Sequence, residues 1–153
     1  MHTYPEAKQF LHDLNDLFAK GKSSEYQLDM SEDGWVEKYE GFINLIGERI
    51  EKYKTSSKEH TIQSTLYTKE TLSSLHKELV VFSEGVKELA DGVAEMMKHF
   101  SDTSFEDIVK SAMSESGATS DFLRITNKHL HNVKQAETIL VDELNSVIKH
   151  INP

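Results

Sequence analysis

The feature that most constrains the fold of this chain is an uninterrupted run of apolar residues between positions 72 and 100. Its members follow one another in alternating steps of three and four residues: Leu72, Leu75, Leu79, Phe82, Val86, Leu89, Val93, Met96 and Phe100. Such spacing places all of them on one face of an α-helix and is typical of coiled-coil seams. The positions on the opposite face, Lys77, Glu84, Asp91 and Lys98, are all charged. The run therefore predicts a long helix that buries one face and exposes the other.

A second run near the C-terminus has the same spacing. Its members are Leu123, Thr126, Leu130, Val133, Glu137, Leu140, Leu144, Val147 and Ile151. Two of them, Thr126 and Glu137, are polar, and Ala136 beside Glu137 is the alternative that keeps the seam apolar. We expect this helix to begin at Thr119 or Ser120. Two long seams joined by a short connection favour an antiparallel helical hairpin.

The first part of the chain carries two shorter helical patterns. Thr3 and Glu6 have the spacing of a capping box, and apolar residues then recur at helical spacing as far as Phe18. A second helix is expected to open near Ser31, with two acidic residues in its first turn and an aromatic-rich stripe that continues to Tyr53. This aromatic-rich second helix would cover the hairpin.

The Ser/Thr-rich stretch after Tyr53 leaves two overall shapes open. Ser56–Glu59 has the pattern of a capping box, which would place a turn near Thr55 and start a new helix at about Lys58. No glycine or proline enforces that break, so a single curved helix over 35–100 fits the pattern as well. The first alternative gives a compact bundle, and the second gives an extended rod.

Two glycines, Gly85 and Gly92, lie beside the first seam one heptad apart. Glycine costs a helix interior about 1 kcal/mol relative to alanine. Their placement fits a neighbouring helix that approaches closely, and it fits equally well two glycines that are tolerated on the surface.

Together these patterns predict an all-α protein, an antiparallel bundle of long amphipathic helices with coiled-coil-like seams. Seven glycines and two prolines are too few turn residues for a β-rich fold of this length. The 153 residues fit one helical domain over 1–153. Within it, 1–30 would form an N-terminal amphipathic helix and connector, and 31–153 the bundle core. A short helix is expected at Phe105–Met113.

The charge and the cysteine count exclude several classes of function. The net charge is −9, which opposes binding to the phosphates of nucleic acid and does not support attraction to an anionic membrane surface. The absence of cysteine rules out disulfides, thiolate catalysis and Cys-type zinc sites. The first residues lack the apolar core of a signal peptide, and no apolar run approaches the ~20 residues of a membrane span. We expect a cytoplasmic protein and leave peripheral membrane association open.

No arrangement of residues indicates catalysis, a cofactor or a metal. Glu95 and His99 lie one helical turn apart, a spacing that a solvated pair explains without a metal. Glu137 is the one seam carboxylate that we expect to be partly buried, and fixing the register of the helices or pairing with Lys134 explains it better than catalysis. We therefore expect a protein that is not an enzyme and that has no cofactor, no metal and no catalytic residue.

The pattern instead favours binding to protein. Seams of this length exceed what one short chain can cover, and the remaining apolar stripe is what a partner contacts. Val80 and Val81 are adjacent and lie off the seam, where a solvent-facing helix is usually polar. With Trp35 and Phe42 they are the candidate partner face. We expect a non-enzymatic helical interaction module, an adaptor or scaffold, that binds itself or another chain; a small acidic helical secretion partner or chaperone is an alternative.

The order of the helical segments also resembles the first long helix of BAR domains, the sorting-nexin type most of all. The resemblance is carried by Trp35-Val36-Glu37-Lys38, by the Ser/Thr-rich middle, by Lys77-Glu78-Leu79 and by Phe82-Ser83-Glu84-Gly85-Val86-Lys87-Glu88-Leu89. It extends over 31–151 and implies that Phe105–Met113 and the last helix match the BAR connection and second helix. The helix around Phe10–Phe18 would then match the amphipathic segment that precedes some BAR domains. The resemblance implies a dimeric, membrane-associated module as a further alternative.

Overall fold

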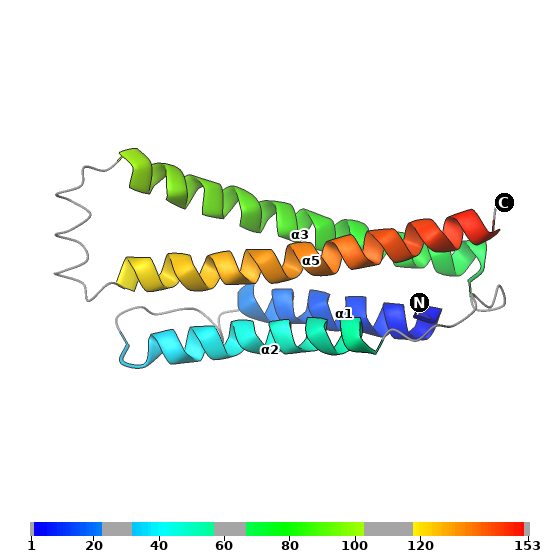
Figure 1. Ribbon diagram of the computed structural model, residues 1–153, viewed down its shortest axis with the longest axis horizontal. Coiled ribbons are helices and arrows are strands. Elements are labelled where there is room, and N and C mark those ends of the chain that lie inside the picture. Colours follow the sequence, from blue (N-terminus) through cyan, green and yellow to red (C-terminus); the bar gives the residue numbers. More distant parts are fainter. Residues whose placement is uncertain (1, 23–31, 57–66, 103–117, 152–153) are drawn as a thin grey trace.

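The computed structural model describes residues 2–22, 32–56, 67–102 and 118–151. In chain order its helices are α1 (Tyr4–Lys22), α2 (Trp35–Thr55), α3 (Lys69–Asp102) and α5 (Ala118–Ile151), and the described residues contain no strand. The predicted all-α bundle is therefore confirmed. In Figure 1, α1 and α3 run in one direction while α2 and α5 run in the other. Both α1 and α5 pack on α2 and on α3, so the helices occupy the four corners of a bundle.

The N-terminal helix begins where its capping box predicts. The backbone N–H of Glu6 donates to Thr3 Oγ1 at 3.4 Å, and the backbone N–H of Thr3 donates to Glu6 Oε1 at 3.4 Å. This reciprocal pair satisfies two N–H groups that the first turn leaves without a helical partner. On the apolar face of α1, Ala7, Phe10, Leu11 and Leu14 are buried, and Leu17 and Phe18 are half-buried against the core. The helix within 1–30 is therefore part of the bundle core.

The second helix begins later than the sequence pattern predicts. We expected a start near Ser31, but α2 begins at Trp35. Gly34, the residue before it, has φ of 80°, a left-handed conformation that side chains disfavour and glycine adopts readily. The chain therefore turns at Gly34. The acidic residue in the first turn is Glu37, and the two acids that we assigned there precede the helix.

The single long helix over 35–100 is wrong, and the turn near Thr55 is confirmed. The helix α2 ends at Thr55, where the N–H of Ser56 closes the last turn on the carbonyl of Lys52 at 3.0 Å. The next helix, α3, begins at Lys69 and runs back in the opposite direction (Figure 1). The expected start near Lys58 lies outside the described residues.

A pair of threonines caps α3. The N–H of Thr71 donates to Thr68 Oγ1 at 3.1 Å, and the N–H of Thr68 donates to Thr71 Oγ1 at 2.7 Å. This is a capping box in which threonine replaces the usual glutamate. Most of the Ser56–Glu59 box that we considered lies outside the described residues, as do the expected short helix Phe105–Met113 and most of the connector that ends at position 30.

Both seams line the core of the bundle. On α3 the buried members are Leu75, Leu79, Phe82, Val86 and Val93, and Leu72, Leu89 and Met96 are half-buried; the side chain of Phe100 lies outside the described part. All four charged residues on the opposite face of α3 are exposed. On α5, Ala136 is fully buried and Glu137 only partly, so alanine takes the seam position.

The two glycines on α3 do not mark a close helix contact. A Cβ placed on Gly85 or on Gly92 would meet no described atom within 4 Å. The interpretation in which both glycines are tolerated on the surface therefore holds. The close approach lies elsewhere, because a Cβ on Gly47 would lie 3.0 Å from Nδ2 of Asn132. Gly47 thus lets α2 lie close to α5.

Candidate interaction surface

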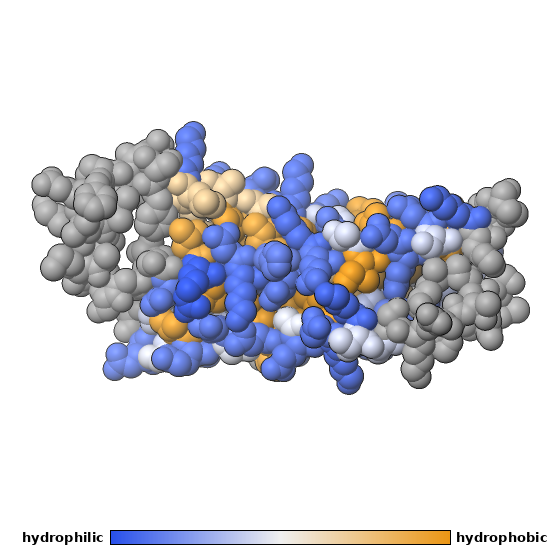
Figure 2. All heavy atoms as spheres, in the orientation of Figure 1, coloured by the Kyte–Doolittle hydropathy of each residue, from blue (hydrophilic) through white to orange (hydrophobic). Residues whose placement is uncertain are grey.

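Large apolar side chains reach solvent in one place more than in others. The exposed ones among the described residues are Leu45, Val80, Val81, Met97, Val141 and Ile148. Five of the six lie on α3 or α5: Val80, Val81 and Met97 are on α3, and Val141 and Ile148 are on α5. Figure 2 shows polar atoms over much of the visible face, with apolar atoms reaching the surface in several places, one of them between α3 and α5. Exposed aliphatic residues that gather in this way are typical of contact surfaces.

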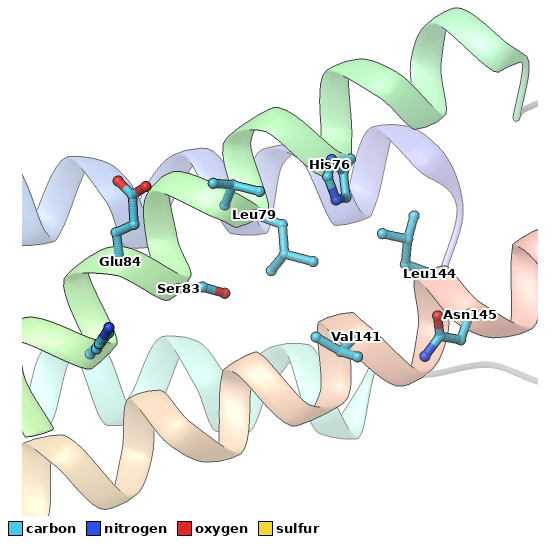
Figure 3. A pocket seen from close by; sticks show the side chains of 9 residues that line it. His76, Leu79, Ser83, Glu84, Val141, Leu144 and Asn145 are labelled. Carbon is cyan, nitrogen blue, oxygen red and sulfur yellow. The ribbon is translucent and has the colours of Figure 1, made fainter.

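A groove runs between α3 and α5 at the same place, and we call it the α3–α5 groove. It has a volume of about 430 Å³ and is lined by His76, Leu79, Val80, Ser83, Glu84, Lys87, Val141, Leu144 and Asn145. Leu79 and Leu144 are buried, while Val80 and Val141 are exposed. Figure 3 shows Leu79 on α3 and Val141 and Leu144 on α5 facing the space between the helices. The groove therefore has an apolar floor and an apolar edge on each side.

The helical repeat explains why the groove forms. Val80 follows the seam residue Leu79, and Val141 follows the seam residue Leu140, so each valine lies about 100° around its helix from the buried line. At that angle a side chain lies at the edge of the contact between two helices. The small side chain of Ser83 leaves space between these edges.

The charged residues of the groove have both signs. Lys87 is cationic, Glu84 is anionic, and His76 and Asn145 add polar side chains. In Figure 3 the carboxylate of Glu84 is turned away from α5. A mixed rim around an apolar floor is suited to an amphipathic protein segment, since the rim can fix the orientation of what the floor binds.

The other side of α5, towards α2, has a different character. Arg124 donates to both carboxylate oxygens of Glu40, at 3.3 and 3.0 Å, and Lys128 donates to Asn44 at 2.7 Å. The hydrogen bond from Arg124 lowers the pKa of Glu40. Polar contacts between helices thus cover this side, whereas aliphatic side chains remain at the α3–α5 groove.

The structure separates the four residues of the predicted partner face. Val80 and Val81 are exposed on α3. Trp35 is buried, and Phe42 is half-buried against the core. Both lie on α2, at the corner of the bundle opposite α3 (Figure 1). In this structure Trp35 therefore does not belong to an exposed face, because its helical spacing places it in the core.

Sequence reasoning missed the α5 side of the groove. Val141 and Ile148 are exposed, one heptad apart. The signal was present, since each follows a seam residue as Val80 does. The bundle leaves both residues uncovered.

A buried polar cluster, the His2 cluster, lies at one end of the bundle and consists of His2, Tyr53, Tyr67 and Glu143. His2 Nε2 donates to the carbonyl of Tyr53 at 2.7 Å, and His2 Nδ1 contacts Glu143 Oε1. Tyr53 donates its hydroxyl to Glu143 Oε2 at 2.5 Å, and Tyr67 donates to the carbonyl of His2 at 2.9 Å. The cluster therefore links the N-terminal residues to α2, to α5 and to Tyr67, which lies just before α3.

Aromatic stacking and burial close this cluster. The ring of Tyr53 lies between those of His2 and Phe10, with centroid distances of 3.6 and 3.8 Å. Burial, with a smaller contribution from Glu143, raises the pKa of both Tyr53 and Tyr67, so both hydroxyls stay protonated and donate. Histidine, glutamate and tyrosine also serve in acid–base catalysis. Here His2 is only 3% exposed and both of its ring nitrogens have partners, which is an arrangement that stabilises the fold.

His129 is a second buried histidine, and its Nδ1 has no partner among the described residues. It lies on α5 with its ring 5.5 Å from that of Phe18. The Nδ1 atom is buried and forms no hydrogen bond within the described part of the chain. Burial lowers the pKa of His129 to about 4, so the ring is neutral at physiological pH. A neutral histidine with an unsatisfied nitrogen costs stability.

Neither a metal centre nor a membrane-spanning helix is found in the described ranges. These residues contain no group of three or more histidine, aspartate or glutamate side chains placed to hold a metal ion. No helix among them is both long enough and apolar enough to cross a bilayer. Comparison of the chain with protein-family models, with curated proteins and with solved structures finds no match.

Proposed function

We propose that this protein is a non-enzymatic interaction module, of the adaptor or scaffold kind, that binds a helix of another protein chain or of a second copy at the α3–α5 groove. One observation carries the proposal. Val80 and Val141 are exposed at the two edges of a groove whose floor is apolar, and Val81 and Ile148 are exposed on the same two helices. Burying an aliphatic side chain of this size stabilises a complex by about 1.5–3 kcal/mol, before the cost of association.

The geometry favours a helix as the bound element. Two antiparallel helices, α3 and α5, form the walls of the groove (Figure 3). An amphipathic helix laid into such a groove contacts both walls with residues spaced three and four apart. The mixed charges of the rim would pair with polar residues on either side of that apolar stripe.

The BAR-like alternative has less support. In that alternative the helix around Phe10–Phe18 would insert into the membrane, but Phe10, Leu11 and Leu14 are buried in the bundle. Inserting them into a bilayer would require α1 to leave the core. The net charge of −9 adds repulsion from anionic lipid. The buried face of α1 also favours a bundle that is stable alone over a chaperone-like chain that is stable only beside its client.

Matched variants test the proposal. Val141→Glu places a carboxylate at the wall of the groove, and Leu45→Glu makes the same change on α2, where Leu45 is 58% exposed. Each tagged protein is purified from its own cells, and the bound proteins are quantified by mass spectrometry. A second copy is detected through a differently tagged chain. We expect a partner that wild type and Leu45→Glu retain and Val141→Glu loses at least tenfold.

The control separates loss of binding from loss of fold. Both substitutions are at exposed positions, so circular dichroism and thermal unfolding are expected to match wild type within experimental error. If Val141→Glu folds normally and retains every protein that Leu45→Glu retains, the α3–α5 groove is not the binding site and the proposal is wrong.

A further inference from the structure

We propose, building on the function above, that the partner of the outer face of α3 is a second copy of this chain, bound antiparallel about a two-fold axis that passes between Val80 and Val81. This names one occupant for the outer face of α3, which lies beside the α3–α5 groove and shares Val80 and Glu84 with it. Val81 is the most exposed large apolar residue of the described part, with 60% of its surface exposed.

The charges of α3 are complementary to a copy of themselves. In two identical antiparallel helices related by this axis, a residue that precedes Val80 faces the residue equally far beyond Val81 in the other copy. Lys77 lies three residues before Val80, and Glu84 lies three residues after Val81. Lys77 of each copy would therefore face Glu84 of the other, and the symmetry forms this pair twice.

The exposed face places these groups where they can meet. Lys77 and Glu84 are exposed, one heptad apart, and so lie along a single line of the helix surface. Val80 and Val81 lie on opposite sides of that line, because successive residues are separated by about 100°. The two-fold axis then brings the four valines of the two copies together at the centre, between the two Lys77–Glu84 pairs. An apolar centre with charged pairs at its edges is the usual anatomy of an interface.

The same symmetry sets the limits of the contact. Ser73 of one copy would face Glu88 of the other, which is compatible with the contact. One heptad beyond the Lys77–Glu84 pair, Glu70 would face Asp91. These like charges lie ~16 Å from the axis at 1.5 Å per residue. The attractive contact is therefore short. A stable complex usually buries about 800 Å² on each partner, so we expect a weak dimer that forms at micromolar or higher concentrations.

Charge exchange tests both the partner and the register. Lys77→Glu places a second carboxylate opposite Glu84 in both symmetric pairs, and Glu84→Lys places two lysines opposite each other. Sedimentation equilibrium over a range of concentrations measures the dissociation constant of each variant. We expect each single variant to dimerise at least tenfold more weakly than wild type. An equimolar mixture of the two single variants is expected to recover the wild-type constant as a heterodimer, as is the double variant Lys77→Glu/Glu84→Lys alone.

Two controls accompany the exchange. Lys38→Glu makes the same charge change at an exposed position on α2, away from α3, and is expected to leave dimerisation unchanged. Val81→Glu places like charges at the axis and is expected to abolish the dimer while the monomer stays folded. The rescue by mixing is specific to a second copy, because an unrelated partner would not respond to paired exchanges on this chain.

The failure of this inference differs from a failure of the proposed function. A wild-type protein that stays monomeric at millimolar concentration would overturn the second copy as the occupant. A dimer whose single variants are not rescued by mixing would overturn it too, because its register would be different. In either case the loss of a partner from Val141→Glu, measured against Leu45→Glu, still decides whether the groove binds another protein.

Discussion

The two ends of the bundle differ in whether a buried histidine has hydrogen-bond partners for its ring nitrogens. At the end formed by the last turns of α2 and the C-terminal half of α5, the His2 cluster gives both ring nitrogens of a buried histidine a partner. His129 lies ~21 Å away along α5, at 1.5 Å per residue, and its Nδ1 has no partner among the described residues. In Figure 1, α3 also lies further from α5 towards that second end.

This difference indicates which contacts stabilise the bundle and which make its stability depend on pH. A buried polar group that is satisfied links helices in a fixed arrangement, whereas one that is not satisfied lowers stability and responds to protonation. We therefore expect the His2 cluster to govern how firmly α1 is held, and His129 to govern how the protein responds to acid.

Removing His2 is expected to have the largest effect. His2→Ala removes the contact between His2 and Glu143, whose side chain is 17% exposed. It also removes the ring that stacks on Tyr53. Breaking a largely buried polar pair from one side is expected to lower the free energy of unfolding by about 4 kcal/mol. Urea unfolding at pH 7 measures this, and the midpoint is expected to fall without a change in slope.

His12 provides the matched control for this prediction. It lies on α1 and is exposed, so His12→Ala is expected to change stability by less than about 0.5 kcal/mol. Equal effects of His2→Ala and His12→Ala would show that the His2 cluster does not link the N-terminal residues to the bundle.

The second prediction concerns acid and the other end of the bundle. Burial lowers the pKa of His129 from 6.5 to about 4, so between these values the unfolded chain binds a proton that the folded protein does not. Stability from this group is therefore fully present above pH 6.5 and is lost as the pH falls towards 4. The loss amounts to about 3 kcal/mol. Thermal and urea unfolding between pH 7 and 4 measure it.

A variant without the imidazole ring of His129 separates its effect on the pH dependence of stability from the effect of the carboxylates. His129→Leu keeps an apolar side chain at the position and is expected to give a flatter stability profile over the same range, with no loss at pH 7. His131→Gln, at an exposed position two residues along, is expected to follow wild type. A profile for His129→Leu that falls as steeply as that of wild type would contradict the prediction.

Much of the fold could be predicted from the sequence because it follows from repeats within single helices. The seam of α3 fixes which of its faces is buried, and the Thr3–Glu6 box fixes where α1 begins. The start of α2 could not be predicted in the same way, because Ser31 and two acidic residues offer good local capping signals. The helix instead begins after Gly34, whose left-handed conformation is not helical and is one that glycine adopts readily.

The candidate site was harder to predict, because it depends on which helices become neighbours. Val80 and Val81 were identified, since two adjacent valines off a seam are unusual within one helix. Val141 was missed, because its exposure depends on how α3 packs against α5. The His2 cluster was missed for a related reason: its members come from four separate parts of the chain, and nothing local links His2 to Glu143.

The smallest expected effect concerns a second buried polar residue near His129, and it tests whether that residue has a stabilising hydrogen bond. Thr126, one turn earlier on α5, is buried, but its hydroxyl lies 2.9 Å from that of Tyr39 and the two bond each other. Tyr39→Phe or Thr126→Val alone leaves one hydroxyl without this partner and is expected to cost about 1 kcal/mol; the double variant removes both hydroxyls and is expected to cost little more than either single change. Urea unfolding of the four proteins gives the coupling energy. A coupling energy near zero would mean that the hydrogen bond between Tyr39 and Thr126 does not stabilise the protein. His129 would then not be the only buried polar side chain in this part of α5 without a stabilising hydrogen bond among the described residues.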